Sequence, residues 1–298
     1  MTGRPAAGPD HNRADAVTVG VLSEMNAPDP RIGRLTQSLV MHVHAFLVEN
    51  QVTWEEWLAG LDFLARAGQW TTPARHELLL LSDTMGSSTL LNALNRHRPA
   101  PDMPATPEHP LLRDAPRRRM GEVLATEEQW AGGDWTRVRG RILDTGGNPV
   151  ARARIGLWQA HGAGEPPNPA GGSRALLTTG SDGAFWFRTV KPRSYHLPTD
   201  GPVGDWLRAT GRHPVRPGNI LARVEAEGYH PLTRRLFVAD DPVLALDASF
   251  GVADGLVLDF LLDEDPVATA AGGMPGPYFD VTCDLVLTPG PPMSEAEA

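Results

Sequence analysis

Apolar residues recur at helical spacing in the first third of the chain. Between Ile32 and Leu47 most of them are separated by three or four residues, which places them along one stripe of an amphipathic helix. A second helix is expected after Thr53, because Thr53 and Glu56 form the S/T-x-x-E pattern of a capping box. Pro73 can occupy the first turn of a third helix. The pattern therefore predicts a helical N-terminal region.

Further along the chain, the pattern changes to short runs of strand-forming residues. These runs are separated by turns rich in Gly, Pro and Asp, such as Ser181-Asp182-Gly183. Strands are expected at 136–143, 154–158, 176–179, 184–188, 220–226, 235–238 and 279–287. Short strands at this spacing favour a mainly β protein built on an antiparallel β-sandwich.

Changes in composition divide the chain into five segments. The two termini are expected to be disordered, and the Pro-rich stretch between the helical and strand patterns is expected to be irregular. The expected segments are a disordered N-terminus at 1–28, a helical region at 29–97, an irregular connector at 98–133, a β-sandwich at 134–289 and a disordered tail at 290–298.

Charge and cysteine content narrow the classes of function. The 298-residue chain has 36 acidic and 27 basic residues, and its formal net charge of −9 argues against nucleic-acid binding or an anionic membrane surface. Cys283 is the one cysteine, so neither an intrachain disulfide nor a Cys-based zinc site is expected, which suits the cytoplasm. The N-terminus has no signal-peptide pattern, and no apolar run reaches the roughly 18 residues of a membrane span.

Three ordered motifs in the second half of the chain resemble those of intradiol ring-cleavage dioxygenases. They are SDGAFWF at 181–187, SYHLPTDGPVG at 194–204 and GRHPVRP at 211–217, and the subgroup they resemble most is hydroxyquinol 1,2-dioxygenase. The resemblance implies a β-sandwich preceded by helices through which two copies form a homodimer. It also implies a pocket for a small cyclic or aromatic ligand and one ferric ion, held by two tyrosinates and two histidines.

The four positions that match these iron ligands are mostly substituted. Tyr195 matches the second tyrosine, whereas Pro166 stands at the expected position of the first, and Asn219 and Leu221 stand at those of the two histidines. Proline and leucine have no side-chain donor, and asparagine offers only a neutral oxygen. We therefore expect no metal and no cofactor. The alternative is a site rebuilt with replacement ligands such as the neighbouring His161.

Several residues of the matched pocket could act without a metal. Tyr195 could serve as an acid or hydrogen-bond donor, Arg216 as an anion clamp, and Asn219 as a donor to a carbonyl. The structural alternatives are a leftover pocket wall, an internal ion pair and the satisfaction of buried backbone groups. Matched or altered pocket positions add the substrate-binding candidates Leu80, Asp83, His109, Pro166, Leu197, Pro198, Leu221, Arg235 and Val252.

Three functions are compatible with this sequence. The favoured hypothesis is a metal-free, cofactor-independent isomerase, cyclase or lyase of secondary-metabolite biosynthesis that acts on a cyclic oxygenated small molecule. The second is a non-catalytic binding or scaffold protein. The third is an Fe(III) hydroxyquinol or catechol 1,2-dioxygenase with substituted ligands. Resemblance in fold does not by itself decide among them.

Overall fold

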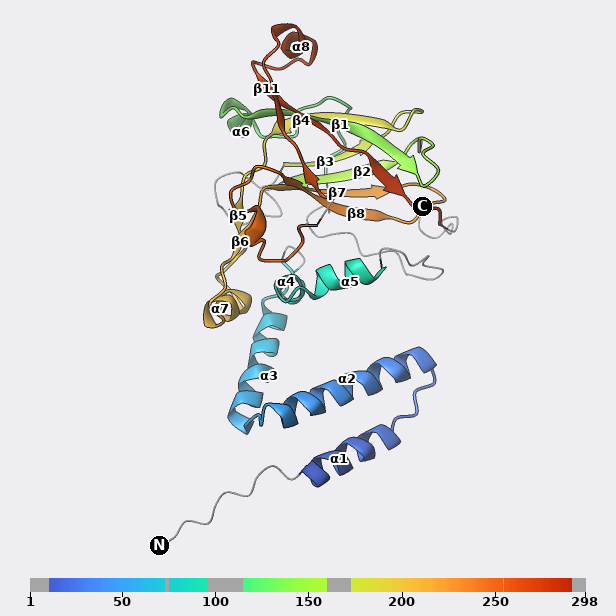
Figure 1. Cartoon of the computed structure of the whole chain (residues 1–298), viewed down its shortest axis with the longest axis vertical. Helices are drawn as coiled ribbons and strands as arrows, with labels where there is room; N and C mark the ends of the chain where they lie inside the picture. The colour runs from blue at the N-terminus through green and yellow to red at the C-terminus, as the bar shows by residue number, and fades with distance from the viewer. Residues whose placement is uncertain (1–10, 73–74, 96–114, 160–172, 254, 291–298) are drawn as a thin grey trace. The chain divides into compact units, whose positions relative to one another are not determined.

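Two compact units make up the chain. The structure is a computed structural model that describes residues 11–72, 75–95, 115–159, 173–253 and 255–290. Its internal contacts separate a first unit, which ends at Arg66, from a second unit, which begins at Ala67. The first unit contains the N-terminal helices, and the second contains all the strands drawn in Figure 1.

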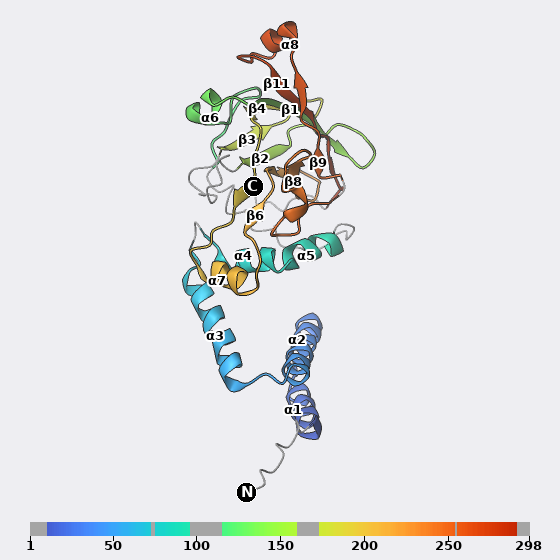
Figure 2. The same ribbon diagram turned by 60° about the vertical axis from the view of Figure 1, so that its left-hand side comes forward.

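Helices α1 and α2 pack against each other in the first unit (Figure 1 and Figure 2). Helix α1 covers His11–Ser23, and helix α2 covers Pro30–Glu49. Thr18 Oγ1 lies 2.8 Å from Nδ1 of His44, which joins the two helices. The expected disorder of residues 1–28 is therefore wrong for the α1 segment. Packing along α2 stabilises this segment as a helix, although its composition alone does not indicate one.

Helix α3 begins where the capping box predicted it. The helix covers Trp54–Gln69. The backbone N–H of Glu56 donates to Thr53 Oγ1 at 3.2 Å, and the backbone N–H of Thr53 donates to Glu56 Oε2 at 2.8 Å. Two backbone donors that would otherwise lack partners at the helix terminus are thus satisfied.

Helices α4 and α5 follow in the second unit. Helix α4 covers Glu77–Thr84, and helix α5 covers Ser87–Asn95. His76 caps α4, because its Nδ1 accepts the backbone N–H of Leu79 at 3.1 Å. The third predicted helix therefore begins after His76 and not at Pro73, which lies outside the described residues. Histidine is not among the usual N-cap residues, so the start of this helix was not recognised in the sequence.

The apolar stripe of the first unit is exposed. None of the residues of α2 is buried, and the stripe residues of α2 and α3 are between 45% and 63% exposed: Ile32, Leu35, Leu39, Phe46, Leu58, Leu61 and Leu64. This stripe does not mark a membrane span, since no helix within the described residues is long and apolar enough to cross a membrane. An apolar face of this extent is characteristic of a protein contact surface.

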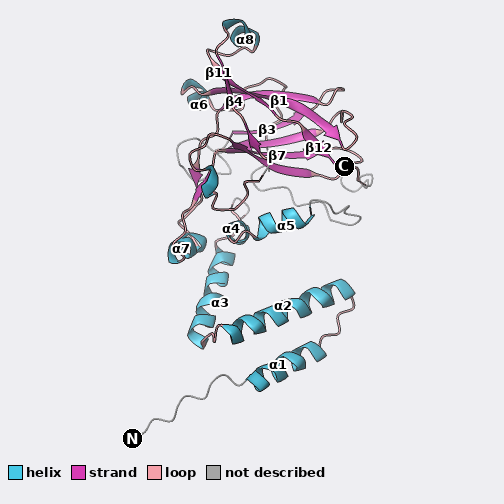
Figure 3. Cartoon of the chain, in the orientation of Figure 1, coloured by secondary structure: helices cyan, strands magenta, loops and turns pink. Residues whose placement is uncertain are grey.

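Two β-sheets form the second unit, and Figure 3 shows them as two facing layers. Within the described residues, one sheet has the order β10-β11-β1-β12, with β4 also paired to β1, and the other has the order β3-β2-β7-β8-β9. The strands are β1 (Trp135–Asp144), β2 (Arg154–Gln159), β3 (Ser173–Thr178), β4 (Ala184–Val190), β7 (Asn219–Glu225), β8 (Leu232–Val238), β9 (Val257–Leu258), β10 (Leu261–Asp263), β11 (Tyr278–Thr282) and β12 (Leu285–Leu287). Side chains from both sheets, including Val138, Ile155 and Phe187, form the core between them.

Smaller elements surround the sandwich. A separate two-stranded ribbon pairs β5 (Tyr195–His196) with β6 (Val215–Arg216). Between its strands lies helix α7, which covers Pro202–Ala209. Two further short helices are α6 (Glu127–Ala131) and α8 (Pro266–Ala271). The ribbon matters most here, because both of its strands carry a candidate site residue.

The prediction of a β-sandwich with N-terminal helices is confirmed, but the sheets are mixed rather than purely antiparallel. Strand β1 pairs in parallel with both β11 and β12, and β8 pairs in parallel with β9. The single strand expected at 279–287 is two strands, interrupted at Cys283 and Asp284. At this break the Cys283 carbonyl approaches Gly140 so closely that a Cβ there would lie 1.8 Å from the oxygen. Only glycine permits that approach.

Candidate functional site

Strand β7 carries two of the candidate residues on one face. Successive side chains of a strand point to opposite sides, and Ile220 and Ala222 belong to the core between the sheets. Asn219 and Leu221 therefore point to the outer side of the sheet. Both are only 1% exposed, so other elements cover them there. This covered outer face is the candidate site.

A row of paired residues crosses the sheet at this face. Trp158 of β2 pairs with Leu221, and Leu221 pairs in turn with Arg235 of β8. Directly paired residues of neighbouring strands point to the same face. Trp158 and Arg235 therefore flank Leu221 on the face that carries Asn219 and Leu221, the two positions matched to the family's histidines.

Tyr195 covers the site from the β5–β6 ribbon, where it pairs with Arg216. Its ring meets Trp158 edge to face, with ring centroids 6.3 Å apart. A small buried cluster results, which consists of Trp158, Tyr195, Leu197, Leu221 and Ala248, with Leu80 of α4 packed against it. The structure thus brings Tyr195, Arg216, Asn219 and Leu221 into one buried region.

Arg216 is held in place by a buried carboxylate. Its Nε and Nη2 donate to the two carboxylate oxygens of Asp247 at 2.8 and 3.1 Å, and both side chains are 3% exposed. Asp247 also accepts the backbone N–H groups of Ser249 and Gly251. Burial alone would lower the pKa of Arg216, but Tyr195 and Asp247 raise it above the ordinary value. Arg216 is therefore a fixed cation. The internal ion pair, which was the structural alternative for Arg216 in the sequence analysis, is present with Asp247 as the partner.

Arg235 places a second cation at the first histidine position. Its Nη1 donates to Oδ1 of Asn219 at 3.1 Å. The other end of that amide is also engaged, because Asn219 Nδ2 donates to the carbonyl of Pro217 at 2.8 Å. Burial lowers the pKa of Arg235, and the nearby Arg216 lowers it further. The charge of Asp83 raises it in part. An arginine nevertheless remains protonated at neutral pH.

The other predicted residues lie at the edge of this region or outside the described chain. Leu197 is buried in the cluster, and Asp83 of α4 lies within electrostatic range of both arginines. Pro198 and Val252 are partly buried on the adjoining segments. His109, Pro166 and His161 lie outside the described residues.

Sequence reasoning missed two contributors to the site. Asp247 was not singled out in the sequence. Trp158 entered only as the last residue of the strand expected at 154–158. Its Nε1–H group is buried and has no hydrogen-bond acceptor among the described residues. A buried tryptophan usually finds such a partner, so this N–H is an unsatisfied donor beside the cluster.

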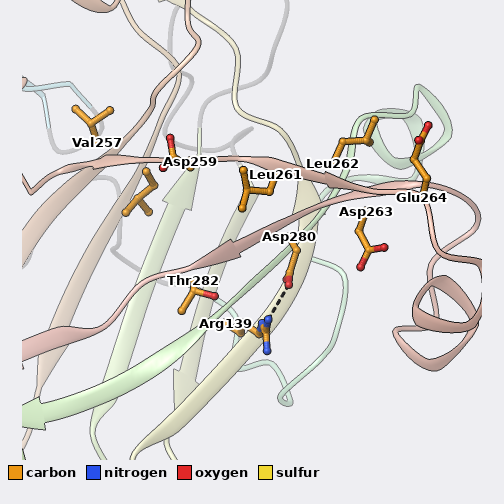
Figure 4. A pocket seen from close by; sticks show the side chains of 10 residues that line it. Arg139, Val257, Asp259, Leu261, Leu262, Asp263, Glu264, Asp280 and Thr282 are labelled. Atoms are coloured by element: carbon orange, nitrogen blue, oxygen red, sulfur yellow. Dashed lines mark hydrogen bonds and ion pairs between the residues drawn. The ribbon is translucent and has the colours of Figure 1, made fainter.

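A separate hollow of about 570 Å³ lies elsewhere on the second unit. Figure 4 shows acidic side chains along its wall, with Asp280 paired to Arg139 at 2.8 Å. Its lining comes from β1, β9, β10, β11 and the residues between them, and it contains none of the candidate residues. The hollow is therefore distinct from the site around Tyr195.

This chain belongs to the intradiol ring-cleavage dioxygenases. The family model for the catechol dioxygenase N terminus matches residues 29–102, and the dioxygenase model matches residues 110–289. Both parts of the family's architecture are thus present in one chain, in the same order as its helical and sandwich regions.

Named relatives share most of the chain's length. Hydroxyquinol 1,2-dioxygenase of Rhizobium sp. strain MTP-10005 is 39% identical over 276 residues, which cover 90% of this chain and 92% of the relative. The enzyme of the same name from Nocardioides simplex is 36% identical and covers 96% and 99% of the two chains. The crystal structure of hydroxyquinol 1,2-dioxygenase from Pseudomonas putida DLL-E4 superposes with a TM-score of 0.76 at 33% identity. The match covers 94% of this chain and 99% of the other.

These relatives correct the hypothesis favoured from the sequence. A metal-free isomerase, cyclase or lyase is contradicted, because relatives 36–39% identical over at least 90% of the chain are hydroxyquinol 1,2-dioxygenases. The substituted ligand positions suggested a change of reaction, but the rest of the chain keeps the sequence and fold of ring-cleaving enzymes. The similarity favours the alternative of a dioxygenase with substituted ligands, and the family is one of enzymes.

The residues at the matched ligand positions do not fit a ferric ion held in the family's way. Tyr195 is a suitable donor, but Leu221 is aliphatic and the amide of Asn219 is already engaged at both ends. The charge of Arg235 would repel a metal cation. Within the described ranges, no group of three or more His, Cys, Asp or Glu side chains could hold a metal ion.

Proposed function

We propose that this chain acts on a hydroxylated aromatic ring of the hydroxyquinol or catechol type, as a ring-cleavage dioxygenase with substituted ligand positions. The observation that carries the proposal is the 39% identity to a hydroxyquinol 1,2-dioxygenase over 90% of the chain. The pocket residues Tyr195 and Arg216 remain at matched positions and are buried together.

The chain's own residues suit the binding of a flat, oxygenated ring. Trp158, Leu197 and Leu221 offer apolar surface, as the walls of small-molecule sites usually do. Arg216 supplies a positive charge that Asp247 holds in a fixed direction, so it can face a deprotonated ring oxygen. Tyr195 offers a hydroxyl that can donate to or accept from the ring.

A second candidate function is binding of the same ring without cleavage. The contact between Arg235 and Asn219 favours it, because a cation stands where the family's ligands converge. Such a protein would keep the family's affinity for the ring but not its reaction.

The homodimer expected from the family resemblance is also part of this proposal. The apolar stripe on α2 and α3 supports it, since residues such as Leu39 and Phe46 are 63% and 52% exposed. A second copy of the same stripe is a self-complementary partner for this surface.

The test combines oxygen uptake with direct binding. Purified protein, with and without added iron, is mixed with hydroxyquinol or catechol, and uptake is compared with protein-free solution. Hydroquinone, whose two hydroxyls are not adjacent, is the matched control ring. Intradiol cleavage should consume one O₂ per ring and place both oxygen atoms in a ring-opened dicarboxylate.

Three outcomes are distinguishable. Saturable uptake with the adjacent diols alone supports the dioxygenase. Saturable binding of the same diols, measured by calorimetry without uptake, supports the second candidate. If the adjacent diols bind no better than hydroquinone and are not consumed, the proposed function is wrong.

A further inference from the structure

The cluster around Tyr195 contains more positive charge than its hydrogen bonds neutralise, because the partly buried Arg235 lies beside the buried Arg216. Arg216 is paired with Asp247 in a two-point ion pair. Arg235 has no such partner: within the described residues its hydrogen bond goes to the neutral amide oxygen of Asn219. Asp83 is close enough to act on both arginines electrostatically, but no hydrogen bond joins it to either. A cation that is partly withdrawn from water and lacks a directly bonded anion is unfavourable.

The position of Arg235 on β8 places its charge at the site. Arg235 pairs with Leu221 and donates to Asn219, so its side chain runs along the outer face of β7 across both residues. Tyr195 and Asp247 also act on Arg235 electrostatically, which places its guanidinium near the ion pair of Arg216. Two guanidinium groups therefore face one small region from neighbouring elements.

An independent observation points to a ligand at the same cluster. Among the described residues the buried indole N–H of Trp158 has no acceptor, and Trp158 is in the same paired row as Leu221 and Arg235. Guanidinium groups and an indole N–H are all donors. A ligand that satisfies them must bring acceptor oxygens and negative charge.

We propose that Arg235, together with Arg216, forms a binding site for an anionic oxygen group carried by an aromatic ring, either a carboxylate or a deprotonated phenol. The proposal rests on the proposed function only for the ring, since the charge of the group follows from the two arginines. A guanidinium presents parallel N–H groups that match the two oxygens of a carboxylate or the adjacent oxygens of a diol. Arg235 is thus a specificity-determining residue of this chain.

Benzoate is the probe for the carboxylate, and catechol is the probe for the phenol oxygen. Benzamide is the neutral isostere of benzoate, so the pair isolates the charge. Binding is measured by calorimetry, with and without EDTA, on the full-length protein. Equal affinity in both buffers shows that a metal does not hold the anion. Because benzoate has no diol to cleave, its binding is independent of any ring-cleavage activity.

The main variant is Arg235→Met, and Arg234→Gln is its matched control. Arg234 is next in sequence but points to the opposite face of β8, because it pairs with the core residue Ala222. Benzoate or catechol should bind Arg235→Met about tenfold more weakly or worse than wild type, since a charged hydrogen bond is lost. The control should bind like wild type, and benzamide should bind wild type far more weakly than benzoate.

Stability without ligand separates a binding role from a structural one. Arg235 is partly buried and has no directly bonded anion among the described residues, so its removal should leave the melting temperature of Arg235→Met unchanged or higher. If this variant does not fold, Arg235→Lys is measured instead, because it keeps the charge but loses the planar fork. It should remain folded and bind the anions several-fold more weakly. The proposal is overturned if benzoate and benzamide bind alike, or if loss of the Arg235 fork leaves the affinity for both anions unchanged.

Discussion

The guanidinium of Arg235 donates to the amide oxygen of Asn219 at 3.1 Å, although the strand register pairs Arg235 with Leu221. The Arg235 side chain therefore extends along β7 over Leu221 and Asn219, which are successive outward-facing residues of that strand. The resemblance matches these two positions to the family's two histidines. The same contact that engages the Asn219 amide brings the positive charge of Arg235 to this place.

Restoring the histidines should raise iron binding. The variant combines Asn219→His and Leu221→His, which place two imidazoles beside Tyr195, with Arg235→His, which replaces the competing permanent charge by a third imidazole. Imidazole and phenolate donors suit Fe(III), so the iron content per chain should rise severalfold over wild type. Metal analysis after dialysis measures it. Adding Tyr195→Phe to this background is the control, and it should remove any visible tyrosinate–iron absorption. Equal iron content in wild type and the restored variant would contradict the prediction.

Removing the hydroxyl of Tyr195 should affect ligand binding more than folding. Tyr195→Phe keeps the ring, which is 2% exposed and packed on Trp158, so the free energy of unfolding should change by less than about 1.5 kcal/mol. Affinity for catechol, and any oxygen uptake, should fall. Tyr278→Phe is the matched control, because Tyr278 is also buried but its hydroxyl donates to Asp263, away from the site. The interpretation fails if both variants bind catechol equally well. Urea unfolding and calorimetry provide the two measurements.

Breaking the buried ion pair should be costly. Asp247→Asn leaves Arg216 buried without its anion, so the free energy of unfolding should fall by about 3–5 kcal/mol. Asp200→Asn is the control, since Asp200 pairs with Arg75 but is 68% exposed, and its change should stay below about 1 kcal/mol. Urea unfolding at neutral pH compares the two. If the free energy of unfolding fell by similar amounts in both variants, the buried ion pair would contribute no more to stability than the exposed one.

The contribution of Asp247 should also depend on pH. Burial would raise the pKa of this carboxyl, but Arg216 lowers it below its ordinary value. A lowered pKa in the folded state means that the stabilisation is fully present above the unfolded value of about 3.9 and is lost as the pH falls through the lower folded value. The stability gap between wild type and Asp247→Asn should therefore be constant near neutral pH and shrink in strong acid. A gap that widens on acidification would contradict this assignment.

Charge on the apolar stripe should abolish the proposed homodimer. Leu39→Glu and Phe46→Glu place carboxylates on the exposed stripe of α2, which disfavours burial against a second copy. Light scattering should then give the mass of one 32.1 kDa chain, against twice that for wild type. Arg34→Glu adds the same charge at an exposed α2 position off the stripe and should leave the dimer intact. A wild-type monomer would refute the proposed assembly.

Local patterns in the sequence were enough to predict most of the elements. Helical spacing and the capping box located α2 and the start of α3, and strand composition located β1, β2 and β7 to within one or two residues of their observed bounds. These features depend on residues close together in the chain, where propensity and capping act. The motif around Tyr195 and Arg216 likewise carried the family resemblance.

Features that depend on distant residues were decided by the tertiary structure. The parallel pairing of β1 with β11 joins residues such as Val138 and Val281, which no local pattern relates. The α1 segment is a helix because it packs along α2.

At the site, the sequence by itself determined which side chains stand at the positions matched to the iron ligands, and the identity of a side chain limits what it can coordinate. Only the fold decided what stands there instead. Arg235 is 16 residues from Asn219 and Asp247 is 31 residues from Arg216, and strand register and chain reversal bring these pairs within hydrogen-bonding distance. The sequence already named Arg235 as a pocket candidate, but its contact with Asn219 and its nearness to Arg216 are properties of that arrangement and not of residue order.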